Sequence, residues 1–189
     1  MKYTLTNETK LLYGRTLHRI KALKDFSDVS KGDLGGWIEK ETNLSQNGMC
    51  WVFGDAKVFG DANVYDNARV YGNARVSGNA KVCGTALVSH NAKVSGNALV
   101  YDNARVYGNA RVYDDAIATK TVKNIIGLPY NITITDNHIQ IGCKQFTFDK
   151  IIKLDKNWTK LKTKYDTNEV KQIEPYRKII VKFVKLEMK

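Results

Sequence analysis

The chain has 189 residues and a formal net charge of +11, because 30 lysine and arginine residues outnumber 19 aspartate and glutamate residues. It contains no apolar run long enough to cross a membrane or to act as a signal peptide, and its three cysteines do not make the even set of a disulfide framework. The composition predicts a cytoplasmic protein of one or two domains that does not engage a membrane. The positive charge indicates an anionic partner or, alternatively, only a lysine-rich surface in contact with solvent.

Residues 1–35 are predicted to form an N-terminal β cap. Within this segment, residues 15–23 alternate between apolar and polar side chains, which is typical of a strand. The glycine-rich run Gly-Asp-Leu-Gly-Gly-Trp-Ile-Glu at 32–39 then leads into a repeat region. A cap is expected there because an open stack of strands leaves unpaired backbone groups at its first coil.

A six-residue period runs without a gap through residues 52–117. Each unit has an inward valine and an alanine four residues later. Most units also have an outward basic or aromatic side chain beside the valine and a corner of Gly or Asp followed by Asn or Asp. A unit this short cannot bury a core alone, so successive units must stack. Residues 36–118 are therefore predicted to form a β-helix. Two imperfect units start at Ile38 and Leu44, with Thr42 and Gly48 in the small-residue positions.

Residues 119–189 are predicted to cover the other end with a hairpin and a helical tail. Two alternating runs, 131–135 and 138–142, flank Asp136 and Asn137, which predicts a β-hairpin. After Pro175, apolar residues recur at helical spacing, which predicts an amphipathic helix packed on the β-helix or, alternatively, lying on a membrane surface. The predicted apolar stripe consists of Tyr176, Ile179, Ile180, Phe183 and Leu186.

These motifs resemble known proteins. The repeat resembles the hexapeptide-repeat left-handed β-helix, in which three units make one triangular coil. Together with the 32–39 run and Ile-Thr-Asp-Asn-His-Ile-Gln-Ile-Gly-Cys at 134–143, it is similar to a family of hexapeptide-repeat proteins common in phages and prophages. The resemblance covers about residues 1–145. It implies a mainly β fold, a left-handed parallel β-helix with an N-terminal β cap and a C-terminal α+β cap. After this motif similar proteins continue with an acidic helix, whereas this chain stays basic.

If one coil holds 18 residues, every third unit returns to the same face. The first face then carries a column of four cations, with aromatic side chains beside it at Phe59 and Tyr113. Like charges about 5 Å apart repel one another, so an acidic protein or a nucleic acid would relieve the column. Alternatively, the corner acids Asp55, Asp61 and Asp115 neutralise it. The column consists of Lys57, Arg75, Lys93 and Arg111.

The other two faces interrupt their basic positions with apolar side chains. Outward apolar residues indicate a cover, either the C-terminal helix, which is favoured, or a second subunit of a homo-oligomer. The predicted interface residues are Leu87, Leu99, Ile117, Tyr65 and Tyr101.

Together these patterns predict a non-enzymatic binding protein that needs no cofactor or metal. Its basic and aromatic faces would engage a host protein, a protein–nucleic-acid complex or nucleic acid. The family resemblance implies a phage-type origin, and on that ground alone the binding would inhibit a host defence. One alternative is a hexapeptide-repeat acyltransferase, for which His90 is the candidate base on the coils. Another is a structural or assembly protein.

Overall fold

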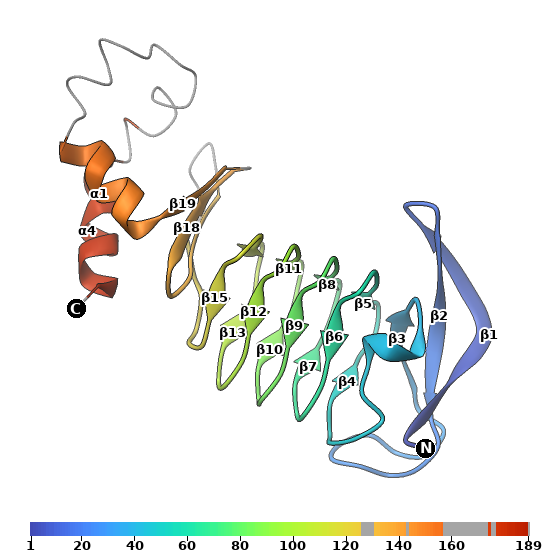
Figure 1. The fold of residues 1–189 in the computed structure, drawn as a ribbon. Helices are drawn as coiled ribbons and strands as arrows, with labels where there is room; N and C mark the ends of the chain where they lie inside the picture. The colour runs from blue at the N-terminus through green and yellow to red at the C-terminus, as the bar shows by residue number, and fades with distance from the viewer. Residues whose placement is uncertain (126–130, 143, 157–173, 175–176, 189) are drawn as a thin grey trace.

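The computed structural model describes residues 1–125, 131–142, 144–156, 174 and 177–188. Its centre is a parallel β-solenoid of stacked coils, with a long hairpin at one end and a small sheet followed by helices at the other (Figure 1). The fold class predicted from the sequence, mainly β with stacked hexapeptide coils, is confirmed. None of the helices in the described part of the chain combines the length and the apolar character that crossing a membrane requires.

Each coil contributes one short strand to each of three parallel sheets, which we call the first, second and third faces. The first face contains β3 (Leu34–Ile38), β5 (Lys57–Val58), β8 (Arg75–Val76), β11 (Lys93–Val94) and β14 (Arg111–Val112). The second contains β6 (Asn63–Val64), β9 (Lys81–Val82), β12 (Leu99–Val100) and β15 (Ile117–Ala118). The third contains β4 (Trp51–Val52), β7 (Arg69–Val70), β10 (Leu87–Val88) and β13 (Arg105–Val106). In the regular region, paired residues are 18 apart in the sequence, as predicted.

The interior of the coils is filled by the repeated valines and alanines. From Ala68 to Val112 every one of them is 0% exposed, which confirms the predicted inward positions. Backbone hydrogen bonds join successive coils, as where the Arg75 N–H donates to the Ala92 carbonyl at 2.9 Å. At one corner the amide of Asn79 donates to Asn97 at 3.0 Å, one coil further along. Apolar packing inside and these repeated bonds outside therefore hold each coil to the next.

The N-terminal hairpin extends the first face. Strand β1 (Tyr3–Leu12) pairs antiparallel with β2 (Arg15–Ala22), and β2 pairs antiparallel with β3. The predicted strand at 15–23 is confirmed, whereas β1 was not predicted. A Cβ atom on Gly36 would lie 2.6 Å from the carbonyl oxygen of Ala56, and one on Gly35 would lie 2.5 Å from the Ile20 side chain. The glycine run is therefore required because the hairpin and the first coil approach its backbone closely.

The two imperfect units before the regular repeat are only partly as predicted. Ile38 pairs with Val58, and Leu44 forms a bridge to Val64, so their apolar positions face inward. The expectation that Thr42 and Gly48 fill the small-residue positions is wrong, because both are exposed. A 3₁₀ turn, η1 (Glu41–Asn43), brings Asn43 inside instead, where its amide donates to the carbonyls of Gly60 and Ala62 at 3.0 and 2.8 Å. The buried Cys50, next to Trp51 in β4, fills the following inward position.

The far end of the solenoid is covered by an antiparallel sheet. It consists of β16 (Lys123–Ile125), β17 (Ile132–Ile134), β18 (His138–Ile141) and β19 (Lys144–Thr147), and the predicted β17–β18 hairpin is confirmed. Its turn satisfies backbone groups of the last coil. Asn137 accepts from the Ile117 N–H at 2.8 Å, and Asp136 accepts from the Thr119 N–H at 2.7 Å. The Asp-Asn pair therefore does more than turn the chain, because it terminates the stack.

Two described helices complete this end, α1 (Phe148–Lys156) and α4 (Arg177–Glu187). They pack with the β16–β19 sheet around a second hydrophobic core, separate from the interior of the coils. The predicted apolar stripe of α4 is confirmed in part. Ile180 is buried and Phe183 packs against the same core, as predicted, whereas Ile179 and Leu186 are exposed and the buried Val181 and Val184 were not predicted. Tyr176 lies outside the described residues. The expectation that this helix covers the outward leucines of the coils is also wrong, because α4 packs on α1 beyond the last coil (Figure 1).

Candidate anion-binding face

The first face brings the predicted basic column together. Lys57 pairs with Arg75, Arg75 with Lys93, and Lys93 with Arg111, each on a neighbouring strand. Strand spacing of about 4.8 Å places the cations at regular intervals along one surface. Three of them, Arg75, Lys93 and Arg111, are partly exposed.

Lys57 does not belong to the exposed surface, which corrects its prediction as a binding residue. It is only 9% exposed, and its ammonium group donates to the backbone carbonyl of Asp55. Burial lowers the pKa of Lys57, and the positive charges of Lys10 and Arg75 act in the same direction. The column available to a partner therefore begins at Arg75, and we call Arg75, Lys93 and Arg111 the cation ladder.

The corner acids do not neutralise the cation ladder. Asp55 lies 3.4 Å from the ammonium group of Lys10, and its pKa is lowered mainly by the indole N–H of Trp37 and also by that lysine. Asp61 lies 2.6 Å from Lys40, and Asp115 accepts from an asparagine amide. Within the described part of the chain, no acidic side chain forms an ion pair with a member of the ladder. An anionic group from outside this surface would therefore be needed to relieve the mutual repulsion of the three cations.

A small pocket opens among these cations. Its volume is about 120 Å³, and its lining combines two cations, two serine hydroxyls and three aromatic rings. The lining residues are Tyr13, Phe59, Arg75, Ser77, Lys93, Ser95 and Tyr113. Both predicted aromatic residues, Phe59 and Tyr113, line it, so the structure brings most of the predicted binding set together.

Tyr13 lines the pocket but was not predicted from the sequence. This residue is in the turn of the β1–β2 hairpin, 72% exposed, and its ring centroid lies 6.4 Å from that of Phe59. The Arg75 guanidinium donates to its hydroxyl oxygen at 2.6 Å. No local signal links residue 13 to the repeat, since its position depends on the pairing of β2 with β3.

The opposite end of the pocket is fixed by the C-terminal sheet. The Gln145 amide donates to the Tyr113 carbonyl at 2.9 Å, and Thr133 accepts from the backbone N–H of Arg111 at 3.0 Å. Burial raises the pKa of Tyr113 above its usual value. In Figure 1, β8 and β11 lie between the hairpin and this sheet, so elements at both ends bound the cation ladder.

The other faces offer less free charge. On the third face, Arg69 lies 3.1 Å from Asp28 and donates to the Tyr71 hydroxyl at 2.9 Å, and the Tyr71 ring stacks on Phe53 at 4.2 Å. On the second face, a hydrogen bond with Cys83 is the main cause that raises the pKa of Tyr65 to about 12. The predicted interface residues Leu87, Leu99, Ile117, Tyr65 and Tyr101 are all half-buried.

His90 occupies a corner of the solenoid, as predicted. Its backbone has a φ of 62°, its side chain is exposed, and its Nδ1 atom lies 3.0 Å from the Ser89 hydroxyl oxygen. His90 lines neither the pocket on the first face nor the pocket between α1 and α4. Across the described ranges, no three histidine, cysteine or acidic side chains gather in a group suited to a metal ion.

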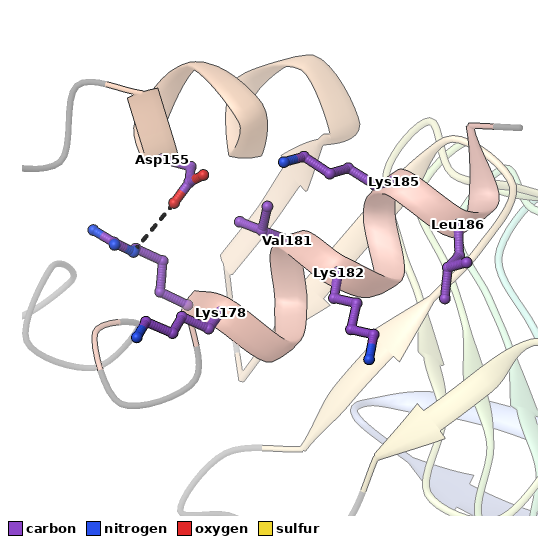
Figure 2. Close-up of a pocket in the computed structure, with 7 residues that line it drawn as sticks. Asp155, Lys178, Val181, Lys182, Lys185 and Leu186 are labelled. Atoms are coloured by element: carbon purple, nitrogen blue, oxygen red, sulfur yellow. Dashed lines mark ion pairs between the residues drawn. The ribbon is translucent and has the colours of Figure 1, made fainter.

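A larger pocket of about 520 Å³ lies between α1 and α4 (Figure 2). Its lining is mostly basic, and it includes the ion pair of Arg177 and Asp155 at 3.2 Å. Lys178, Lys182 and Lys185 point outward from α4 around it. We assign no site to this pocket, because the chain joining the two helices lies outside the described residues.

Comparison with known proteins places the similarity in the coils. A family model described as the YdcK β-solenoid repeat matches residues 62–78, 68–84 and 104–118. A relative from Escherichia coli K12, named "Uncharacterized acetyltransferase YdcK", is 51% identical over 37 residues, which are 20% of this chain and 11% of the relative. The chain thus matches only a small part of that relative's length. The shared feature is the β-solenoid repeat, in agreement with the fold.

Proposed function

We propose that this chain is a non-enzymatic binding protein whose first face holds an anionic macromolecule. The observation that carries the proposal is the cation ladder, Arg75, Lys93 and Arg111, in register on one rigid sheet and without acidic partners in the described structure. A rigid row of unneutralised positive charges lowers the stability of the fold unless an anionic partner offsets the repulsion. A host protein–nucleic-acid complex in the cytoplasm would supply such a partner. The phage-type resemblance supports the finer proposal that binding inhibits a host defence.

Affinity capture from a bacterial lysate tests this proposal. We expect the wild-type protein to retain a partner that the Arg75→Glu, Lys93→Glu variant fails to retain. The reversal at Lys81 and Arg105, exposed cations on the other two faces, provides the matched control. Treatment with nuclease separates a protein partner from a nucleic acid. Equal capture by all three proteins would contradict a function located on the first face.

Acyl transfer is a second candidate, favoured by the name of the E. coli relative, which calls it an acetyltransferase. His90 would have to act as the general base, which requires it to reach an acceptor hydroxyl near a bound acyl donor. Its exposed corner position, outside both the first-face pocket and the pocket between α1 and α4, argues against this role. We expect a calorimetric titration with acetyl-CoA to show no binding with a dissociation constant below about 1 mM, which corresponds to a binding free energy of about −4 kcal/mol. Tighter binding that His90→Ala abolishes would support the enzyme instead.

Self-association through the second and third faces is a further proposal. Leu87, Leu99 and Ile117 are half-buried in the single chain, so only part of their apolar surface is left for a second subunit. If they form an interface, Leu87→Lys combined with Leu99→Lys should shift the solution mass to that of one chain. Light scattering of both proteins measures this, and a wild-type protein that already has the mass of one chain would exclude the interface.

A further inference from the structure

The pocket of the first face differs from a simple basic stripe, because aromatic rings stand on both sides of the charges. Tyr13 and Phe59 lie at its N-terminal end and Tyr113 at its C-terminal end. Between them, on consecutive coils, are Ser77 and Ser95. A purely acidic polypeptide would use the cations but would gain little from the rings.

The size of the pocket limits what can enter it. At about 120 Å³ the pocket is small, so it suits a compact anion such as a phosphate group, while the rest of a larger ligand would lie on the open face around it. Arg75 and Lys93 supply the positive charge, and the serine hydroxyls supply neutral donors to phosphate oxygens.

We propose that the first face binds single-stranded nucleic acid. Phosphates lie along the cation ladder, and unpaired bases stack on the outer rings of Tyr13 and Tyr113. Positive charge that follows a backbone, combined with aromatic rings that accept bases, is the usual basis of sequence-tolerant single-strand binding. A duplex cannot use the rings, because its bases already stack inside the helix. This inference rests on the proposed function and names the partner class.

Fluorescence anisotropy with a labelled twelve-residue oligothymidylate tests the inference. We expect Tyr13→Leu and Tyr113→Leu each to weaken binding by about fivefold or more, since each variant removes a ring on which one base stacks. Tyr107→Leu, at a tyrosine that is 45% exposed beside the third face, should change nothing and serves as the matched control. A duplex of the same length should bind more weakly than the single strand.

Polyglutamate of similar charge, measured in the same assay as a competitor, separates two kinds of failure. One result is that the tyrosine variants bind the oligonucleotide as the wild type does, while Arg75→Gln with Lys93→Gln binds neither the oligonucleotide nor polyglutamate. The first face then binds anions but does not bind bases. The inference is then overturned, and an acidic protein becomes the partner of the proposed function. If neutralising these two cations changes the binding of neither polymer, the proposed function itself fails.

Discussion

Val82→Asp should unfold the solenoid locally or destabilise it by several kcal/mol. Val82 is 0% exposed inside the coils, and a carboxylate there would lie among apolar side chains without a partner. Chemical denaturation followed by circular dichroism measures the free energy of unfolding. Lys81→Asp provides the matched control, because the neighbouring side chain points outward and is exposed, so it should cost little.

The pH dependence of this variant gives a second check. Burial raises the pKa of a carboxyl group above its unfolded value of about 3.9. The neutral form is favoured in the folded state, so the destabilisation should be smallest below about pH 4 and should grow as the pH rises. Wild-type stability at pH 7 in the Val82 variant would contradict the inward assignment of the valines.

Reversing two charges of the cation ladder, Arg75→Glu with Lys93→Glu, should abolish partner binding while leaving the fold intact. Both side chains are partly exposed, and the hydrogen bond from Arg75 to Tyr13 is the one described side-chain bond lost. Facing an anionic partner, the introduced acids turn attraction into repulsion. We expect affinity to fall at least about 100-fold, or about 2.8 kcal/mol.

The control for this reversal must change the net charge equally. Arg69 is unsuitable because it pairs with Asp28 of the N-terminal region, so its reversal would disturb that contact. Lys81→Glu with Arg105→Glu alters two exposed cations away from the first face. Isothermal titration of both variants with the same anionic polymer measures the difference. Equal losses would show that total charge, and not the first face, determines binding.

The register of the coils was predictable because a six-residue period leaves little freedom. Once three units make a coil, arithmetic places Arg75, Lys93 and Arg111 on one face, and the strand pairing agrees. The alternation of strand side chains likewise separates Val82 from Lys81. Here the local pattern and the tertiary contacts carry the same information.

The features that were mispredicted depend on long-range packing. Lys57 follows the same repeat pattern as its neighbours in the column, but it is buried and pairs with Trp37 of β3. Lys10 of the N-terminal hairpin lies over the Trp37 ring and pairs with Asp55. Tyr13 reaches the pocket only because β2 pairs with β3 at the start of the solenoid. In α4, the burial of Val181 and Val184 in place of Ile179 depends on where α1 and the C-terminal sheet contact the helix. None of these contacts can be predicted from the local periodicity of the chain.

The salt dependence of single-strand binding tests most directly whether the cation ladder holds the anionic chain. Each phosphate contact to a single strand contributes a slope of about −0.7 to log K against log salt concentration. For Arg75→Gln with Lys93→Gln, we expect a slope shallower by about 1.4 than that of the wild type, because two phosphate contacts are lost. The matched pair Lys81→Gln with Arg105→Gln should keep the wild-type slope. A slope unchanged by the first-face pair, or reduced equally by both pairs, would contradict the assignment.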